Sequence, residues 1–372
     1  MLKVGITGQN GFIGTHLFNT LGLFKDEFER IVFEKSFFED QEKLQEFVNK
    51  CDVIVHLAAL NRHEDAKVIH DTNILLVEKL INALRQTKSK AHIIFSSSTQ
   101  EDKDNLYGKS KMNCRDLLIN WSLLSGGTFT GLIIPNVYGP FGKPNYNSVV
   151  ATFCYKLINN QHPIIDIDTT LKLIYVGDLI NIIIEKIRKA ESTHKHIING
   201  NFEISVSNLL KKLMYFKENY IDKGIVPKLE NIFDINLFNT FRSYIDLEKV
   251  FPRKYIKHTD DRGCFVEVIK LGVGGQISFS TTDLGITRGN HFHTRKIERF
   301  SVIKGDALIQ LRKINDDQIY NFYLTGNEPS YVDMPIWFTH NIKNIGTEVL
   351  YTIFWINEFY DTNDPDTYFE NV

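Results

Sequence analysis

The sequence predicts an α/β domain with a doubly wound parallel sheet, followed by an all-β domain of the jelly-roll type. The first prediction rests on an opening strand at residues 3–7 that enters a glycine-rich turn and a helix, and on apolar strands at residues 52–59 and 91–98. The second rests on short strands at regular spacing, separated by glycine-rich turns, from residue 259 onward. We expect the first domain to span residues 1–244, a linker residues 245–252 and the second domain residues 253–372.

Composition narrows the class of protein. A chain of 372 residues that is 43% hydrophobic is long enough for two buried cores. The formal net charge of -2, without a basic block, argues against nucleic acid or an anionic membrane as a partner. Four cysteines without CxxC spacing predict free thiols, and we find neither a signal peptide nor an apolar run of membrane-spanning length. We therefore expect a cytoplasmic protein.

The first strand ends in the turn GQNGFIG at residues 8–14. Gly8 permits a tight turn, Gly11 lets the backbone approach a pyrophosphate, and Gly14 lets the following helix pack closely on the strand. The amides at the start of that helix then face the phosphates of a dinucleotide. The predicted cofactor contacts in this turn are Gly8, Asn10, Gly11, Phe12, Ile13 and Gly14.

Two further segments are expected at the adenosine end of the cofactor. The second strand, at residues 30–33, ends just before Glu34 and Lys35, in the region that contacts the adenosine ribose in dinucleotide-binding folds. An acidic residue there favours NAD and a basic one NADP, and Lys35 leads us to expect NADPH. Leu57 and Ala58, at the end of the third strand, are expected beneath the adenine and ribose, although the same run also fits a plain core strand.

Ser98, Tyr107 and Lys111 form the predicted catalytic set. Ser98 stands at the carboxyl end of a buried strand, and Tyr107 and Lys111 are four residues apart on a predicted helix. This spacing places both side chains on one face, so we expect the Lys111 ammonium to lower the pKa of Tyr107 and to hold the cofactor ribose. Ser98 then hydrogen-bonds the substrate oxygen while Tyr107 gives or takes its proton. A YxxxK pattern alone is common on helices, but the preceding glycine turn and Ser-ended strand favour the catalytic interpretation.

With these motifs, residues 1–244 resemble the extended short-chain dehydrogenase/reductases, a group that works on nucleotide sugars. The resemblance rests on the GxxGxxG turn, on the catalytic set and on PNVYGP at residues 135–140. It implies a Rossmann-type fold with Pro135 beside the nicotinamide and Asn136 toward the substrate. Ile133 departs from the family pattern, because many members carry arginine three residues before that asparagine.

The segment KPNYNS at residues 143–148 falls where this group holds its substrate. Asn145, Tyr146 and Asn147 are candidates for hydrogen bonds to sugar or phosphate oxygens. A turn built on asparagine and proline is an equally good interpretation of the same residues.

Four candidate metal ligands stand out in the second half. The run GITRGNHFHTRKIERFSVIKG at residues 285–305 holds His291, His293 and Glu298, and His340 follows on a later predicted strand. If the run forms two strands of a small antiparallel barrel, the period of two aims both histidines at one face, and Glu298 can return beside them on the next strand. Three imidazoles and a carboxylate suit Zn²⁺ or another divalent first-row metal better than Mg²⁺ or Ca²⁺. The alternative is a set of surface histidines on an ordinary β-domain.

This pattern resembles a cupin, and DxRGxFxE at residues 260–267 with RGxH at residues 288–291 resembles the cupin-type 3,5-epimerases of nucleotide-linked 4-keto-6-deoxy sugars. The resemblance implies that a sugar diphosphate is oriented by Arg262, Glu267 and Arg288. The family commonly uses the histidine at the place of His291 to abstract a proton. Here His291 is either a metal ligand, with another group moving the proton, or the base of a site without metal. Trp337 stands where the family motif PxGxxH has glycine.

Together, and in this order, the two halves resemble the bifunctional enzymes of bacterial capsular and O-antigen polysaccharide synthesis. The resemblance implies a homodimer that acts on a UDP-linked 4-keto-6-deoxy amino sugar. The second domain then epimerises C3, and the first reduces the C4 ketone with NADPH to UDP-N-acetyl-6-deoxy-L-talosamine, a precursor of UDP-N-acetyl-L-fucosamine. The alternatives are a 4,6-dehydratase or 4-epimerase joined to a cupin epimerase, and a sensor that only binds NADP and a sugar.

Overall fold

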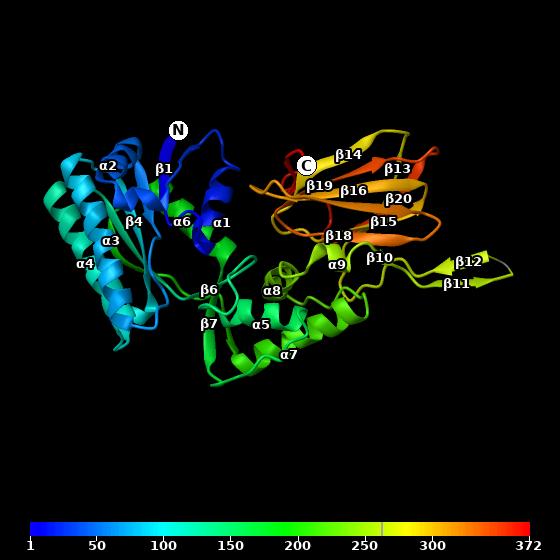
Figure 1. The fold of residues 1–372 in the computed structure, drawn as a ribbon, viewed down its shortest axis with the longest axis horizontal. Coiled ribbons are helices and arrows are strands. Elements are labelled where there is room, and N and C mark those ends of the chain that lie inside the picture. Colours follow the sequence, from blue (N-terminus) through cyan, green and yellow to red (C-terminus); the bar gives the residue numbers. More distant parts are fainter. Residues whose placement is uncertain (262) are drawn as a thin grey trace. The chain divides into compact units, whose positions relative to one another are not determined.

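The computed structural model describes residues 1–261 and 263–372 (Figure 1). Contacts between residues divide it into two compact units. Unit 1 comprises residues 1–152 and 165–207, and unit 2 comprises residues 153–164 and 208–372. Unit 1 contains a parallel sheet and the last third of the chain contains antiparallel sheets, which confirms the predicted fold class.

Unit 1 is built on a six-stranded parallel sheet in the order β2-β1-β3-β4-β5-β8. The chain passes from β1 to β2 on one side and then to β3 on the other, so a switch point lies between β1 and β3, where the carboxyl ends of strands leave a crevice for a ligand. The strands are β1 (Leu2–Thr7), β2 (Phe28–Ile31), β3 (Val53–His56), β4 (His92–Ser98), β5 (Phe129–Ile134) and β8 (Thr193–Ile197).

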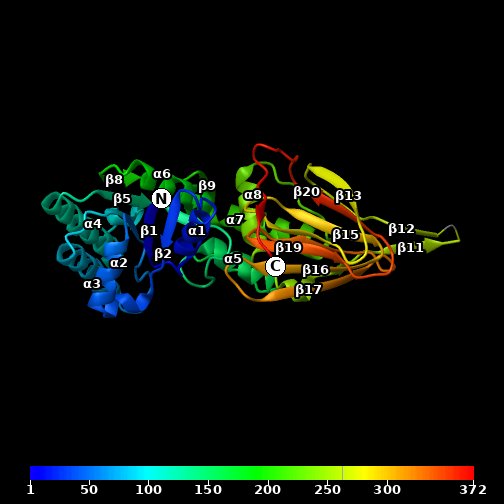
Figure 2. The same ribbon diagram turned by 90° about the horizontal axis from the view of Figure 1, so that it is seen from above.

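Helices cover both faces of this sheet (Figure 2). One hydrophobic cluster joins the sheet to α2, α3 and α4 through residues such as Phe47, Leu80 and Leu118. A second cluster joins the other face to α1 and α6, through residues such as Leu17 and Ile180. The helices are α1 (Phe12–Leu21), α2 (Gln41–Lys50), α3 (Ala66–Gln86), α4 (Leu106–Ser125) and α6 (Val176–Lys189), with short 3₁₀ segments η1 (Lys35–Glu39) and η2 (Thr99–Asp102).

The second strand differs from its predicted position. It was expected at residues 30–33 but spans residues 28–31 as β2. The backbone amide of Phe33 donates to the side chain of Gln9 at 3.2 Å, so the chain has already left the sheet at that residue. A second, three-stranded sheet in unit 1 has the order β6-β7-β9, with β6 (Asn136–Tyr138), β7 (Thr170–Tyr175) and β9 (Phe202–Ser205).

Residues 208–244 group with unit 2, whereas the sequence analysis assigns them to the first domain. Tyr220 donates to Asp333 at 2.5 Å, and Arg299 forms a bidentate ion pair with the same buried carboxylate. Arg242 donates to a backbone carbonyl at the end of β18 at 3.0 Å. The hydrogen bonds of these buried polar groups form only when the helices of residues 208–244 pack on the strands of unit 2. The unit boundary defined by contacts therefore lies before residue 208 and not at the predicted residue 244. The remaining helical elements are α5 (Val149–Ile158), α7 (Val206–Phe216), the π-type segment η3 (Lys217–Asp222), α8 (Ile232–Arg242) and α9 (Leu247–Val250). Helix α9 lies within the predicted linker.

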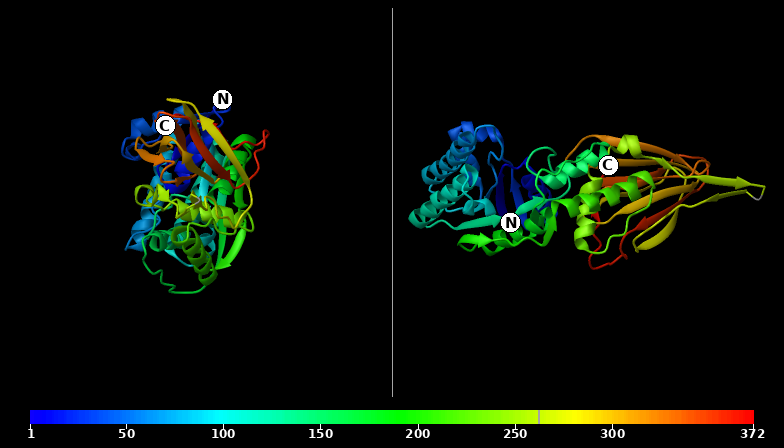
Figure 3. Two further views of the ribbon diagram at one scale, coloured as in Figure 1. Left: turned by 90° about the vertical axis from the view of Figure 1, so that its right-hand side faces the viewer. Right: turned by 90° about the horizontal axis from the view of Figure 1, so that it is seen from below.

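Two five-stranded antiparallel sheets form the rest of unit 2, with the orders β10-β18-β15-β20-β13 and β17-β16-β19-β14-β21. A separate hairpin, β11 with β12, extends away from both sheets (Figures 1 and 3). The strands are β10 (Arg253–Lys254), β11 (Lys257–Asp260), β12 (Gly263–Val266), β13 (Gln276–Thr282), β14 (Thr287–Phe292), β15 (Glu298–Lys304), β16 (Asp306–Lys313), β17 (Ile319–Thr325), β18 (Ser330–Met334), β19 (Phe338–Asn344), β20 (Leu350–Ile356) and β21 (Tyr368–Phe369). In the part of the chain that the structure describes, no helix has the length and apolar character needed to cross a membrane.

Candidate functional sites

The glycine-rich turn lies between the carboxyl ends of β1 and β3. Gly8 has a φ of 75°, in the left-handed region, and a Cβ there would lie 2.8 Å from the amide nitrogen of Ala58. A Cβ on Gly14 would lie 2.2 Å from the carbonyl oxygen of Gly8. Helix α1 begins after Gly11 with no side-chain cap and no acidic residue in its first turn, so its first amides suit an anion such as a pyrophosphate. The remaining predicted contacts in the turn are exposed or half-buried: Asn10, Phe12 and Ile13.

The predicted adenosine contacts follow the strands on either side of β1. Lys35 is exposed at the start of η1, two residues after the amide that binds Gln9 of the glycine turn. The amide of Leu57 donates to the carbonyl of Thr7 at 3.1 Å, and the amide of Ala58 donates to the Thr7 hydroxyl at 3.4 Å. Both sides of the crevice are thus tied to the strand that ends in the glycine turn.

The predicted catalytic residues meet at the carboxyl edge of β4. Ser98 ends that strand, and its hydroxyl accepts a hydrogen bond from the amide of Gln100 at 3.2 Å. Tyr107 lies in the first turn of α4, and the Lys111 ammonium lies 5.9 Å from the centre of the Tyr107 ring. A Cβ on Gly108 would lie 1.9 Å from the carbonyl oxygen of Gln100. Because α4 packs this closely on the turn after Ser98, all three side chains share one edge of the sheet.

Burial controls the protonation of this set. Burial lowers the pKa of Lys111 to about 8, and its ammonium donates to the carbonyl of Ser96 at 2.9 Å. Burial and, to a smaller extent, Tyr146 raise the pKa of Tyr107 to about 12. The net shift is upward, with burial as its largest cause, which is opposite to the lowering expected from Lys111. Tyr107 therefore keeps its proton at neutral pH, which suits a proton donor.

The chain leaves the large sheet where β5 is followed by β6. Pro135 is buried between these strands, and Asn136 after it is exposed. Strand β5 pairs with β4, with Ile134 opposite Ser98, so both residues follow the edge that carries the catalytic set. Ile133 is buried in β5, as an apolar residue at that position should be.

Arg62 organises the predicted substrate loop, although the sequence analysis did not single it out. Its guanidinium donates to the carbonyl of Asn145 at 3.0 Å and to that of Tyr146 at 2.7 Å. Asn145 has a φ of 54°, a left-handed conformation that asparagine tolerates. Tyr146 lies close enough to Tyr107 to affect its pKa, and Asn147 is exposed. No periodicity or motif marks Arg62, because its contacts lie more than eighty residues away in the chain.

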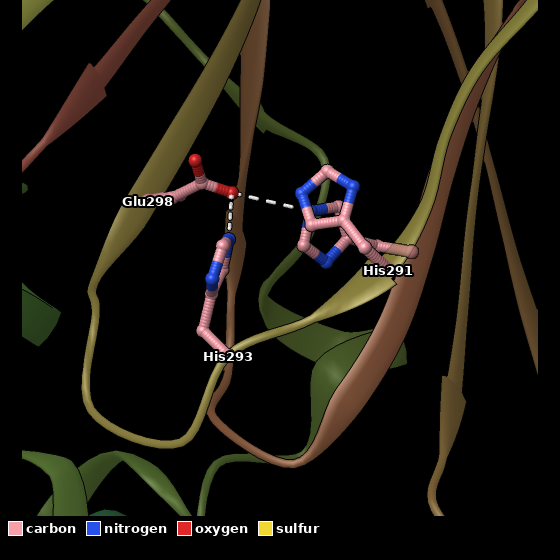
Figure 4. Close-up of side chains that lie close together, drawn as sticks. His291, His293 and Glu298 are labelled. Carbon is pink, nitrogen blue, oxygen red and sulfur yellow. Dashed lines mark ion pairs between the residues drawn. The ribbon is translucent and has the colours of Figure 1, made fainter. Parts of the chain in front are cut away.

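The four predicted metal ligands come together in unit 2. One ligand atom from each of His291, His293, Glu298 and His340 lies within 4.8 Å of the others. The Nε2 atom of His293 lies 3.0 Å from one oxygen of Glu298 (Figure 4), and the Nε2 atom of His340 lies 3.1 Å from the same oxygen. Glu298 returns beside the histidines as expected, but from the second sheet, because His291 pairs with His340 in one sheet and Glu298 begins a strand of the other. The cluster therefore joins the two sheets.

The donor atoms of this cluster fit a bound cation. His293 Nε2, His340 Nε2 and Glu298 Oε2 are buried and have no hydrogen-bond partner. The Nδ1 of His293 donates to the carbonyl of Asp366, and the Nδ1 of His340 donates to the carbonyl of Phe338 at 3.3 Å. Since carbonyls only accept, each Nε2 of a neutral ring carries a lone pair. Converging lone pairs from imidazoles and a carboxylate match the ligands of Zn²⁺ or a related divalent metal.

The pKa values in the cluster reflect this crowding. Burial, followed by the neighbouring His340 and His293, lowers the pKa of His291 to about 4. Burial alone would lower the pKa of His293, but the Glu298 carboxylate raises it above its usual value. Burial would likewise raise the pKa of Glu298, but His293 and His340 hold it well below its usual range. Glu298 is therefore ionised at neutral pH and attracts positive charge into the cluster.

Trp337 keeps the backbone shape that the glycine of PxGxxH would have. Its φ is 63°, in the left-handed region, and its side chain is buried and stacked on Phe292 with ring centres 5.6 Å apart. Its amide donates to the carbonyl of His293 at 2.8 Å. These contacts hold a bulky residue in an unfavourable conformation, and they fix His293 to the turn that leads into the strand of His340.

The predicted diphosphate contacts are less well supported by the geometry. Arg262 lies outside the described residues. Glu267 follows β12 and pairs with Lys270 at 2.5 Å, and Arg288 is exposed on β14, three residues before His291. Within residues 1–261 and 263–372, no hydrogen bond or ion pair joins Glu267 or Arg288 to the four ligands of the cluster.

Comparisons with known proteins agree with this architecture. Residues 4–199 match the NAD dependent epimerase/dehydratase family, and residues 258–368 match the Polysaccharide biosynthesis C-terminal domain. The chain is 32% identical, over 99% of its length, to the UDP-2-acetamido-2,6-beta-L-arabino-hexul-4-ose reductase of Pseudomonas aeruginosa, 98% of which is covered.

Solved structures of similar proteins have the same fold. The capsular polysaccharide assembling protein CapF from Staphylococcus aureus is 34% identical, with a TM-score of 0.63 and complete coverage of both chains. RMD from Pseudomonas aeruginosa complexed with NADPH is 17% identical, with a TM-score of 0.51 over 57% of this chain and 81% of that one, which shows the fold alone.

A Rossmann-type domain with a Ser-Tyr-Lys edge, joined to a β-domain with a buried histidine and carboxylate cluster, defines a two-domain enzyme of the nucleotide-sugar reductase type. The chain belongs to the NAD dependent epimerase/dehydratase family and, over its full length, to the CapF-type bifunctional enzymes.

Proposed function

We propose that the chain is a bifunctional, homodimeric enzyme acting on a UDP-linked 4-keto-6-deoxy amino sugar. Unit 2 epimerises C3 of UDP-2-acetamido-2,6-dideoxy-4-hexulose, and unit 1 reduces the C4 ketone to UDP-N-acetyl-6-deoxy-L-talosamine, the precursor of UDP-N-acetyl-L-fucosamine. The observation that carries the proposal is the common edge of Ser98, Tyr107 and Lys111 in a chain similar over its full length to a protein named as a UDP-hexulose reductase.

In the reduction, Tyr107 is the proton donor. NADPH, when bound, supplies the hydride that C4 accepts. Ser98 donates a hydrogen bond to the C4 oxygen, and Tyr107, whose pKa is about 12, gives its proton to that oxygen as negative charge develops there. The Lys111 ammonium, close to the phenol ring, stabilises the phenolate that remains. The ketone thereby gains one hydride and one proton and becomes a secondary alcohol.

Cofactor binding rests on the first three strand ends. The uncapped start of α1 and the glycine cradle suit a pyrophosphate, since a Cβ at Gly8 or Gly14 would fill the space. We assign the additional phosphate of NADP to Lys35 and the adenosine to Leu57 and Ala58. Lys35→Glu should raise the KM for NADPH while the KM for NADH changes little, and equal changes in both would contradict this assignment.

In the epimerisation, unit 2 uses the acidity of the C–H bond beside the ketone. His291, His293, Glu298 and His340 would hold a divalent metal, with Zn²⁺ favoured by the donor set. Such an ion would supply a Lewis acid for the ketone oxygen, which would make the C3–H bond more acidic. We assign the orientation of the sugar diphosphate to Arg262, Glu267 and Arg288. Return of a proton from the opposite face inverts C3, and later reduction of the ketone makes the new configuration permanent.

Hydrogen exchange tests both halves. The protein is incubated in D₂O with the UDP-4-keto sugar, with and without NADPH, and the product is followed by NMR. We expect deuterium at C3 without NADPH, and oxidation of NADPH once it is added. His291→Ala should abolish exchange and Tyr107→Phe should abolish only reduction, whereas the exposed control changes His194→Ala and Tyr323→Phe should affect neither. If the unmodified protein shows no deuterium exchange and no NADPH oxidation, the proposal is excluded. If it turns over with bound NAD that is regenerated, a dehydratase or 4-epimerase is favoured.

A further inference from the structure

We propose that the C-terminal segment at residues 365–370 forms the outer shell of the metal site, with Asp366 as the residue that positions His293. The inference rests on the metal-binding role proposed above for the four-residue cluster. It adds a residue that is not a ligand, in a segment that the proposed reaction does not otherwise use.

The backbone of Asp366 fixes the orientation of one ligand. Its carbonyl oxygen accepts a hydrogen bond from the Nδ1 of His293, across 73 residues of sequence. Because that bond places the ring proton on Nδ1, the Nε2 lone pair faces the cluster. Histidine ligands of metals are commonly oriented in this way by an acceptor on the second nitrogen.

The side chain of Asp366 fixes the loop between two ligands. One carboxylate oxygen accepts from the amide of Thr294 at 3.0 Å and from its hydroxyl at 2.7 Å. The other accepts from the amides of Arg295 and Lys296, both at 3.0 Å. A 2% exposed carboxylate thus receives four hydrogen bonds from three consecutive residues between His293 and Glu298. The spacing of these two ligands is therefore set by Asp366.

The rest of the segment contacts the two remaining ligand strands. Phe369 pairs with His291 in the ladder between β21 and β14, and Tyr368 stacks on Phe292 with ring centres 5.3 Å apart. The carbonyl of Glu370 accepts from the hydroxyl of Thr339, the residue before His340. The segment therefore touches a ligand or its immediate neighbour at three of the four positions, and Asp366 also binds the amide of Lys296, two residues before Glu298.

Charged groups hold the segment in place. Lys296 is buried, and its ammonium donates to the carbonyl of Pro365 at 2.7 Å. Arg295 donates to Glu358 at 3.1 Å and to Asp364 at 3.0 Å. These bonds join the loop between the ligands to the part of the chain that leads into Asp366. Loss of an outer-shell partner of this kind commonly lowers metal affinity by about 10–100-fold.

Metal affinity can be measured without enzyme activity, by competition with a chromophoric chelator for Zn²⁺ and by titration with Co²⁺ followed by visible absorption. Asp366→Gly keeps a residue suited to the left-handed φ of 40° and keeps the backbone carbonyl, but removes the carboxylate. Asp366→Asn keeps one acceptor for Thr294 and loses the acceptor for the amides of Arg295 and Lys296. The matched control is Asp361→Asn, which changes an exposed carboxylate five residues earlier in the chain that accepts from the amide of Asn363 at 2.8 Å.

We expect the metal dissociation constant to rise about 10–100-fold in Asp366→Gly, to rise less in Asp366→Asn, and to stay unchanged in Asp361→Asn. The Co²⁺ spectrum of Asp366→Gly should also differ from that of the unmodified protein, because the ring of His293 is no longer held. Unchanged affinity and spectrum in both folded Asp366 variants would overturn the outer-shell role.

Failure of the metal site itself gives a different result. The proposed metal-binding function of the cluster fails if the unmodified protein binds neither Zn²⁺ nor Co²⁺, or if Glu298→Ala binds them as tightly as the unmodified protein. Either result would be distinct from a failure of the role of Asp366. Circular dichroism checks that each variant is folded. If both Asp366 variants unfold, Thr294→Val decides the question, because it removes one of the four bonds; a several-fold loss of affinity supports the inference and an unchanged affinity overturns it.

Discussion

The catalytic edge of unit 1 and the ligand cluster of unit 2 differ in how their polar atoms are satisfied. At the catalytic edge, Lys111 donates to a strand carbonyl and Ser98 accepts from the amide two residues on. In the cluster, the Nε2 atoms of His293 and His340 and one oxygen of Glu298 are buried without a hydrogen-bond partner. The first site is thus internally bonded by the folded chain, whereas the polar atoms of the second converge on one another and suit a bound cation.

Because their polar atoms are satisfied differently, the two sites should contribute differently to reaction rate and to folding stability. A buried polar atom without a partner costs about 1–3 kcal/mol, so binding of a cation by the cluster contributes to the stability of unit 2. The catalytic edge gains no such stability from its reacting groups, and burial of Lys111 acts against folding. Changes at the catalytic edge should therefore alter the reaction rate most, and changes at the cluster should alter metal affinity and stability together.

The largest expected effect is that of Tyr107→Phe on reduction. Removal of a general acid typically lowers the rate by about 10²–10⁴-fold, and the half-buried hydroxyl contributes little to folding. The rate of NADPH oxidation with a 4-keto sugar measures the first effect, and urea unfolding measures the second. A similar loss in the exposed control Tyr323→Phe, or a near-normal rate in Tyr107→Phe, would contradict the contrast between the two sites.

Metal removal should have the next largest effect, and on unit 2 alone. A ligand present at about 1,000 times its dissociation constant stabilises the folded state by about 4 kcal/mol. Addition of a chelator should destabilise unit 2, which hydrogen exchange of the backbone amides in its strands would measure as faster exchange. The exchange of the amides in unit 1 should stay unchanged. Glu298→Ala should show no response to the chelator. A stabilisation by Zn²⁺ that persists in this variant would place the ion elsewhere.

Much of the catalytic edge could be predicted from the sequence because its determinants are local. Gly8 needs a left-handed φ and Gly14 a close helix approach, and both requirements lie within one turn. Tyr107 and Lys111 share a face because of the helical repeat. The raised pKa of Tyr107 was not predictable, because it depends on burial by residues that spacing does not reveal.

The cluster could be predicted as a set of ligands but not as a geometry. The spacing of His291, His293 and Glu298 indicates a shared site, but it does not reveal that the strands carrying them belong to two different sheets. Asp366 and Arg62 act through contacts more than seventy residues away, which leave no periodic signal. The grouping of residues 208–244 with unit 2 likewise depends on long-range contacts such as that of Tyr220 with Asp333.

Lys111→Met should stabilise the protein while it abolishes reduction. Burial lowers the pKa of Lys111 from 10.5 to about 8, so the folded chain holds this proton less tightly than the unfolded chain. The cost, about 3 kcal/mol, is complete at pH values below about 8 and disappears as the pH rises to about 10.5. Urea unfolding should show a gain in Lys111→Met at about pH 7 that shrinks toward pH 10. The exposed Lys109→Met on the same helix should show no such gain.

The smallest expected effect compares two helix caps. Asn105 caps α4 by accepting from the amide of Gly108 at 2.7 Å, and Asp40 caps α2 by accepting from the amide of Lys43 at 3.1 Å. Replacement of either by alanine should lower the free energy of unfolding by about 1 kcal/mol. Only Asn105→Ala should also lower kcat, by several-fold, because α4 carries Tyr107 in its first turn and misplacement of a reacting group slows catalysis. Equal kcat values in the two variants would mean that the catalytic edge is held by the packing of Gly108 on Gln100 rather than by the helix terminus. A lower kcat in Asn105→Ala alone would show that a local cap positions the proton donor, whereas the cluster of unit 2 depends on contacts from distant parts of the chain.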